Sequence, residues 1–288
     1  MSTEQKYRLT EVTNEIQLGG STKKFKVHRI QALKELTHFK RKNPVIIRPG
    51  DLGGWVESER NLSHEGESWI GDEAVAFMNG RVEGDAYVTG TAAVFGNAIV
   101  KDTALVRGDA EIFDEAIICE YARIWGNGAV GGSVIISGQG VVHNHGRVTG
   151  EARISGKAKV IQNGSVTGSA RISDNTTIGG SAHVGGITEI GGWTVINGNA
   201  DLRAGIYSGG SMLVAPDVRW VTVGPVQRVP EGKPVWVTLQ FTDKTVNCER
   251  FSGNLEQFQV WAKSNLMIDP FNINVFFKSH LSYLSFNQ

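Results

Sequence analysis

The chain has 288 residues, with 36 glycines, 7 prolines, and 29 Lys and Arg that balance 29 Asp and Glu. This neutral balance gives no electrostatic indication of a nucleic acid partner, and no run of about 18 apolar residues could span a membrane. The first residues lack the apolar core of a signal peptide, and Cys119 and Cys248 stand far apart, which indicates neither a disulfide framework nor a zinc site. We therefore expect a cytoplasmic protein without a metal centre or a membrane partner.

The segment EIQLGGSTKKFKVHRIQAL, residues 15–33, reads as two strands around a Gly-Gly turn. Residues 1–50 carry eleven Lys and Arg against four Asp and Glu, whereas residues 70–120 carry three against ten. Opposite charge blocks in one chain favour packing against each other. We expect residues from about Tyr7 to Ile47 to fold over the start of the next segment, with cations near Glu73, Glu83 and Asp85.

A six-residue repeat follows and continues without a break for roughly 130 residues. Every sixth residue from Ala74 to Ala200 is Ala, Gly or Thr, except Val134. Every sixth residue from Ile70 to Leu202 is Val, Ile or Leu, except Ala76. Each small-x-aliphatic triplet indicates a short strand with two inward side chains, and the Gly-rich residues after it indicate a turn. The repeat therefore predicts coils that stack through parallel hydrogen bonds.

The repeat resembles the hexapeptide-repeat proteins, which fold as a left-handed parallel β-helix. The resemblance implies three hexapeptides per coil, hence about seven coils between Ile70 and Leu202. An irregular first coil is expected before Ile70, because Val56, Leu62 and Ser68 already occupy the small-residue frame. The opening segment with GDLGGWVES, residues 50–58, also resembles phage and prophage proteins labelled hexapeptide acyltransferases.

After Pro216 the composition changes, and a small α+β unit is expected. VRWVTVG (residues 218–224), VWVTLQF (residues 235–241) and FNINVFF (residues 271–277) read as strands. In residues 254–265 we expect a helix with Asn254 as the N-cap and Gln257 at the third position. The predicted fold is thus a mainly β chain, with a β cap in residues 1–55, a β-helix in residues 56–203 and a C-terminal domain in residues 216–288.

Outward residues 18 positions apart should form columns along the coils. One predicted column contains Phe77, Phe95 and Phe113, and another contains Ile99, Ile117 and Ile135. Such ladders favour packing within a sheet, but an exposed apolar patch usually marks an interface. We expect self-association through these six residues, with Phe113 and Ile117 to Ile135 left uncovered by the N-terminal segment.

Basic columns provide a third possible surface. Arg153 with Arg171, and Arg123 with Lys159, could meet phosphate, but no aromatic residues interleave with them as in nucleic-acid-binding proteins. This pattern favours a solvated face over nucleic acid.

Two functions from different classes remain open. The leading one is a non-catalytic, self-associating scaffold or binding protein without a cofactor, of phage or prophage origin. The alternative is an acyltransferase that uses acyl-CoA, for which the resemblance implies a trimer and a histidine as general base. His143 and His183, in outward positions, are the candidates, and His145 lies at a turn. A solvated surface role is the simpler reading of these histidines. A host protein is a further candidate partner.

Overall fold

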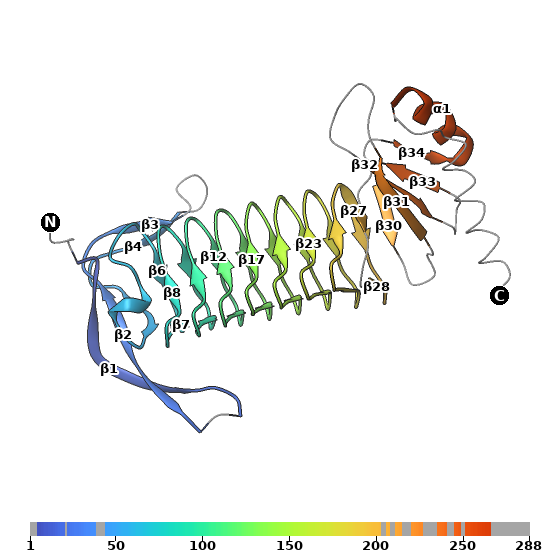
Figure 1. Ribbon diagram of the computed structural model, residues 1–288. Helices are drawn as coiled ribbons and strands as arrows, with labels where there is room; N and C mark the ends of the chain where they lie inside the picture. Colours follow the sequence, from blue (N-terminus) through green and yellow to red (C-terminus); the bar gives the residue numbers. More distant parts are fainter. Residues whose placement is uncertain are drawn as a thin grey trace.

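The computed structural model describes residues 5–20, 22–38, 44–202, 206–207, 211–214, 220–226, 235–240, 245–248 and 251–265. Over these residues the chain is mainly β, and its helical segments are the short 3₁₀ turn η1 (Glu59–Asn61) and the helix α1 (Leu255–Asn265). Short parallel strands stack into a solenoid with three faces (Figure 1). This architecture confirms the parallel β-helix predicted from the six-residue repeat.

We name the three faces A, B and C. Face A is the 11-stranded sheet of β1 (Tyr7–Gln17), β2 (Lys24–Ala32), β5 (Leu52–Val56), β7 (Val75–Ala76), β10 (Ala93–Val94), β13 (Glu111–Ile112), β16 (Ala129–Val130), β19 (Arg147–Val148), β22 (Ser165–Val166), β25 (His183–Val184) and β28 (Asp201–Leu202). Face B is the 8-stranded sheet of β8 (Arg81–Val82), β11 (Ile99–Val100), β14 (Ile117–Ile118), β17 (Ile135–Ile136), β20 (Arg153–Ile154), β23 (Arg171–Ile172), β26 (Glu189–Ile190) and β29 (Ile206–Tyr207). Face C is the 9-stranded sheet of β6 (Trp69–Ile70), β9 (Tyr87–Val88), β12 (Leu105–Val106), β15 (Arg123–Ile124), β18 (Val141–Val142), β21 (Lys159–Val160), β24 (Thr177–Ile178), β27 (Trp193–Ile196) and β30 (Ser211–Val214).

Every coil of the regular solenoid is 18 residues long, because each strand pairs in parallel with the strand 18 residues later. Ile99 lies opposite Ile117, and Ile117 lies opposite Ile135. The solenoid makes about eight turns. The irregular first coil expected before Ile70, with β5, η1 and β6, pairs with the next coil, and β29 and β30 continue the stack beyond Leu202.

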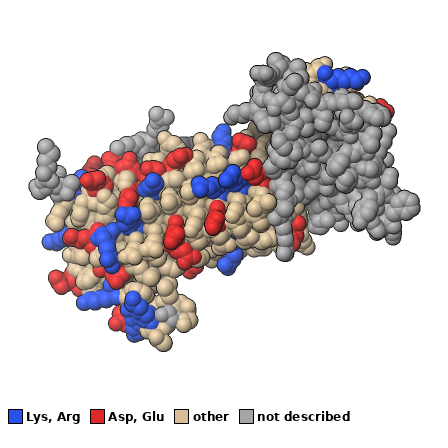
Figure 2. Space-filling model, in the orientation of Figure 1, with Lys and Arg blue, Asp and Glu red and all other residues tan. Residues whose placement is uncertain are grey.

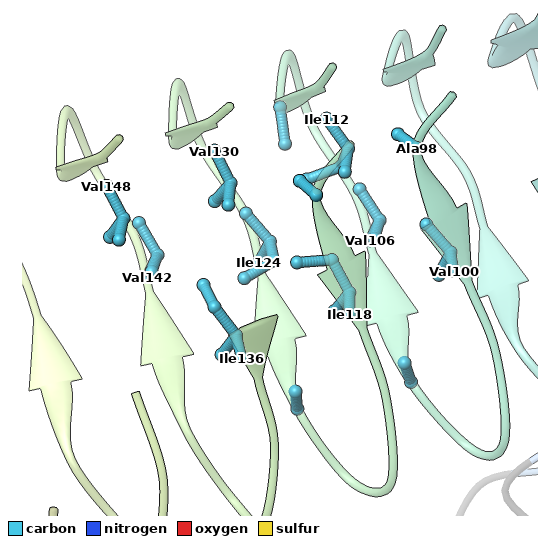
Figure 3. Close-up of a cluster of buried hydrophobic side chains, with 14 of the residues drawn as sticks. Ala98, Val100, Val106, Ile112, Ile118, Ile124, Val130, Ile136, Val142 and Val148 are labelled. Carbon is cyan, nitrogen blue, oxygen red and sulfur yellow. The ribbon is translucent and has the colours of Figure 1, made fainter. Parts of the chain in front are cut away.

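The core is the interior of the solenoid, filled by the two inward positions of each repeat. Figure 3 shows part of it, with Val and Ile side chains from successive coils in contact along the axis. Ile154 is fully buried, whereas its neighbour Arg153 is exposed, as the inward–outward assignment predicts. A buried Val or Ile contributes about 1.5–3 kcal/mol, and the contribution depends on the coils above and below.

The corners between faces use left-handed backbone, as the Gly-rich turns predict. Eight described non-glycine residues also have φ between 52° and 59°. They are Asp72, Met78, Asp102, Asp114, Glu120, Asn144, Gln162 and Asp174. Most of these are acidic or amide residues, which tolerate this conformation better than branched ones.

Two antiparallel strands cover the N-terminal end of the solenoid, as expected. β1 pairs with β2 around a turn in which Gly20 has a φ of 78°, and β2 pairs in turn with β5. Because β5 also pairs with β7, face A is continuous from this hairpin into the solenoid. The exposed end of the coil stack is thereby paired rather than left open.

At the C-terminal end, β31 (Trp220–Val226), β32 (Val235–Gln240), β33 (Thr245–Cys248) and β34 (Phe251–Asn254) form an antiparallel sheet followed by α1. The predicted capping box is confirmed, because the backbone N–H groups of Asn254 and Gln257 each donate to the other's side-chain oxygen, at 2.9 and 2.8 Å. Phe258 of α1 is fully buried. The strand expected in residues 271–277 lies outside the described residues.

Candidate interaction face and histidine sites

The phenylalanine column exists, but its first member is covered. The rings of Phe77 and Phe95 stack with centroids 5.2 Å apart, and those of Phe95 and Phe113 stack at 5.6 Å. Phe25 from β2 lies on Phe77 with ring centroids 5.1 Å apart, and Phe77 is only 1% exposed. Phe77 therefore cannot contact a partner, and this part of the predicted interface is wrong. Phe95 and Phe113 are half-buried.

The N-terminal hairpin accounts for the burial of Phe77. Phe25, Val27, Val75 and Phe77 form a small apolar cluster beside the main core. At its rim, Arg29 forms an ion pair with Glu73 at 2.7 Å, as the opposite charge blocks predict. Glu83 instead pairs with Arg81 within the solenoid, at 3.3 Å.

The isoleucine column lies on face B. Ile99, Ile117 and Ile135 occupy the same outward position of three consecutive strands and are half-buried. Arg81 precedes them in the same row, and Arg153 follows. With a coil spacing of about 4.8 Å, the three side chains form an apolar strip about 10 Å long between two basic residues.

Cys119 follows β14 at the edge of this strip and is partly buried. Burial raises the pKa of the Cys119 thiol, and the nearby carboxylates of Glu120 and Asp102 act in the same direction. The thiol is therefore held in its neutral form, which does not favour a role as a nucleophile.

The candidate histidines lie on different faces and form no common site. His143 follows β18 on face C and stacks on Trp125 with centroids 5.1 Å apart, while the Arg107 guanidinium lies 5.4 Å from the Trp125 ring. The Nδ1 atom of His143 is buried and has no hydrogen-bond partner. His143 is thus a packed member of a stacked column rather than a solvated residue. His145 is exposed at a corner.

His183 belongs to β25 on face A. Its Nδ1 atom lies 3.2 Å from the Ser165 hydroxyl, and its Nε2 atom lies 3.3 Å from the Thr167 hydroxyl. Both neighbours come from the preceding coil. Within the described part of the chain, no carboxylate is hydrogen-bonded to His143 or His183, so neither ring has the acidic partner that usually orients a general base.

A groove of about 450 Å³ lies on face B and the corner that follows it. It is lined by Ile135, Ser137, Arg153, Ile154, Ser155, Arg171, Ile172, Ser173, Asp174, Glu189, Ile190 and Gly191. The sequence indicated the arginine column, but it gave no sign of the depression. Figure 2 shows that basic and acidic residues intermix along the visible side of the solenoid, so that no extended region of one sign covers it.

Among the described residues, no helix is long and apolar enough to cross a membrane, and no group of three or more His, Cys, Asp or Glu could hold a metal ion. No protein-family model matches the chain, and a search of curated proteins finds no significant match.

Proposed function

We propose that this protein is a non-catalytic β-helical scaffold that self-associates through face B. The observation that carries the proposal is the strip of Ile99, Ile117 and Ile135, which are in register, half-buried and flanked by the exposed residues Arg81 and Arg153. A partner that covered the strip would remove its remaining apolar area from water, which is favourable at about 25 cal/mol per Å².

We propose that the partner is a second copy of the chain. The strip is straight and repeats at the coil spacing, so the same strip on another copy has the matching period. The resemblance to hexapeptide-repeat proteins favours a trimer. An origin in a phage or prophage and a location in the bacterial cytoplasm belong to the same proposal, and a host protein that binds face B is the outcome to consider if the chain does not self-associate.

The experiment compares two substitutions of the same kind on different faces. Ile117→Glu places a charge at the centre of the strip, whereas Val141→Glu places one at the equivalent outward position on face C, between Arg123 and Lys159. Light scattering should show that Ile117→Glu shifts the protein to the monomer and that Val141→Glu keeps the oligomer. Both variants should melt within a few degrees of the natural protein, because both positions point outward.

Equal assembly of both variants would contradict the proposal, and so would loss of assembly in both. If both variants assemble, the contact between copies lies elsewhere. If neither assembles, the loss is not specific to face B.

A CoA-dependent acyltransferase is the second candidate, and the contact that favours it is the 3.2 Å approach of Ser165 to His183. A hydroxyl next to an imidazole is the arrangement that activates a nucleophile or an acceptor. Calorimetry with acetyl-CoA distinguishes the two functions. If the protein is a scaffold, any binding of acetyl-CoA is the same in the natural protein, His183→Ala and His143→Ala. Loss of acetyl-CoA binding in His183→Ala would support the enzyme.

A further inference from the structure

The face-B groove contains two arginines in adjacent coils that repel each other. Arg153 and Arg171 lie directly opposite in parallel register, and both are exposed. Like charges in this position destabilise a sheet. Arg171 has a partner in Glu189, but their atoms are 3.3 Å apart, and the side chains are 66% and 45% exposed. Arg153 forms no ion pair or hydrogen bond within the described part of the chain through its guanidinium. An anion between the two guanidinium groups would offset the repulsion.

Hydroxyl groups line the groove beside these arginines. Ser137, Ser155 and Ser173 occupy the equivalent position of three successive coils, and all three line the groove. Ser173 is already bonded to Asp174 and to the Ile190 carbonyl. The side-chain hydroxyls of Ser137 and Ser155 have no such partner among the described residues, so they are available as donors to a ligand oxygen.

The groove also has an apolar wall and an acidic end. Ile135 forms the wall beside Arg153, whereas Asp174 and Glu189 lie at the opposite end. Asp174 accepts a hydrogen bond from the Gly192 N–H at 2.8 Å, and Glu189 faces Arg171. An anion is therefore favoured at the Arg153 end and disfavoured near the carboxylates. A ligand that places an apolar group on Ile135 fits the same end.

We propose that this groove binds a small organic monoester of phosphoric or sulfuric acid. The tetrahedral oxyanion lies between Arg153 and Arg171 and accepts from their guanidinium forks, with Ser137 and Ser155 as further donors. The organic group lies against Ile135. The site shares Ile135 with the proposed contact strip but includes neither Ile99 nor Ile117, so a monomer that has lost the contact retains every group of the site.

The test is calorimetry on the full chain at low ionic strength, with phenyl phosphate and phenyl sulfate as probes. We expect saturable binding of one probe molecule per chain. Arg153→Gln and Arg171→Gln should each weaken it at least tenfold, and Arg171→Lys should weaken it less. Higher affinity for one probe identifies the ester class. Binding should also weaken as salt is added.

Arg147→Gln is the matched control, because Arg147 occupies the same outward strand position on face A and is exposed. It should bind like the natural protein. Absence of saturable binding in the natural protein would overturn the proposal, and so would an equal loss in Arg147→Gln, which would indicate general charge attraction. Ile117→Glu should lose assembly yet keep probe binding, which separates this site from the proposed function.

Discussion

At the corners of the solenoid, single side chains satisfy backbone groups of the following coil. The Gly132 N–H donates to Asp114 Oδ2 at 2.9 Å, and the Glu120 N–H donates to Asp102 Oδ2 at 3.0 Å. The same arrangement recurs from Glu120 to Gly138 and from Asp174 to Gly192. The acidic residue tolerates the left-handed corner and accepts a bond that glycine cannot accept, so it links two coils.

Three substitutions of Asp114 separate the contribution of the corner hydrogen bond from that of the left-handed backbone. Asp114→Asn keeps a side-chain acceptor and a tolerated backbone, so its melting should be nearly unchanged. Asp114→Gly removes the hydrogen bond together with the Cβ, whereas Asp114→Ala removes the same bond and keeps a Cβ, without a polar group, in the left-handed region, where φ is 56°. We expect losses of about 1 kcal/mol and about 2–3 kcal/mol respectively in the free energy of unfolding. If urea melts show Asp114→Gly to be as stable as the natural protein, the corner bond contributes nothing, and if Asp114→Ala is as stable as Asp114→Gly, the left-handed backbone adds no cost.

These corner bonds mark the boundary of what the sequence could predict. The inward positions, such as Ile154, follow from the six-residue period, because one face of every triplet must be buried. The corner bonds join residues 18 positions apart, and they appear only when the coil length and register are known. The groove beside Arg153 was missed for the same reason, since its walls come from four different coils.

At the scale of elements, the hairpin of β1 and β2 is an integral cover of the first coils. Tyr7 donates from its hydroxyl to the Leu62 carbonyl at 2.9 Å, and Phe25 covers Phe77. The charge blocks predicted that this segment packs on the solenoid. The outward columns also predicted that it leaves Phe113 uncovered, but they did not identify Phe25 as the residue that covers Phe77, because that depends on where the hairpin crosses the column.

Phe25→Ala tests the cover. It should expose Phe77 and lower the free energy of unfolding by about 2–4 kcal/mol, somewhat less than for a central core position. Hydrogen exchange should accelerate in β1 and β2. Lys24→Ala is the control, because Lys24 is exposed and solvent screens its ion pair with Glu15, so that its loss should leave stability almost unchanged. Unchanged exchange in Phe25→Ala would mean that the hairpin is held by backbone pairing alone.

For the whole molecule, a buried lysine makes stability depend on pH. Lys6 is fully buried, and its Nζ atom donates to the Ser68 hydroxyl at 2.8 Å. Burial, with repulsion from Lys34, lowers the pKa of Lys6 from 10.5 to about 7. The unfolded chain therefore binds more protons than the folded chain between pH 7 and 10.5, and this group makes stability rise with pH in that window and fall as pH decreases through it.

The measurement is the free energy of unfolding in urea at pH 7.0 and 8.5. The natural protein should gain stability over this interval relative to Lys6→Met, which lacks the titrating group. Lys24→Met should retain the gain, because the hydrogen bond with Glu15 raises the pKa of Lys24 and keeps it protonated throughout. Parallel pH profiles for the natural protein and Lys6→Met would show that Lys6 keeps an ordinary pKa when folded.

The central claim is that the solenoid is a building block that assembles through face B. Sedimentation equilibrium of the natural protein over a range of concentrations tests it most directly. We predict a mass that is a multiple of the 31.2 kDa chain, with three copies favoured, and a shift toward the monomer only on dilution. A mass of 31.2 kDa at every concentration would contradict the claim and leave the isoleucine strip for a different protein.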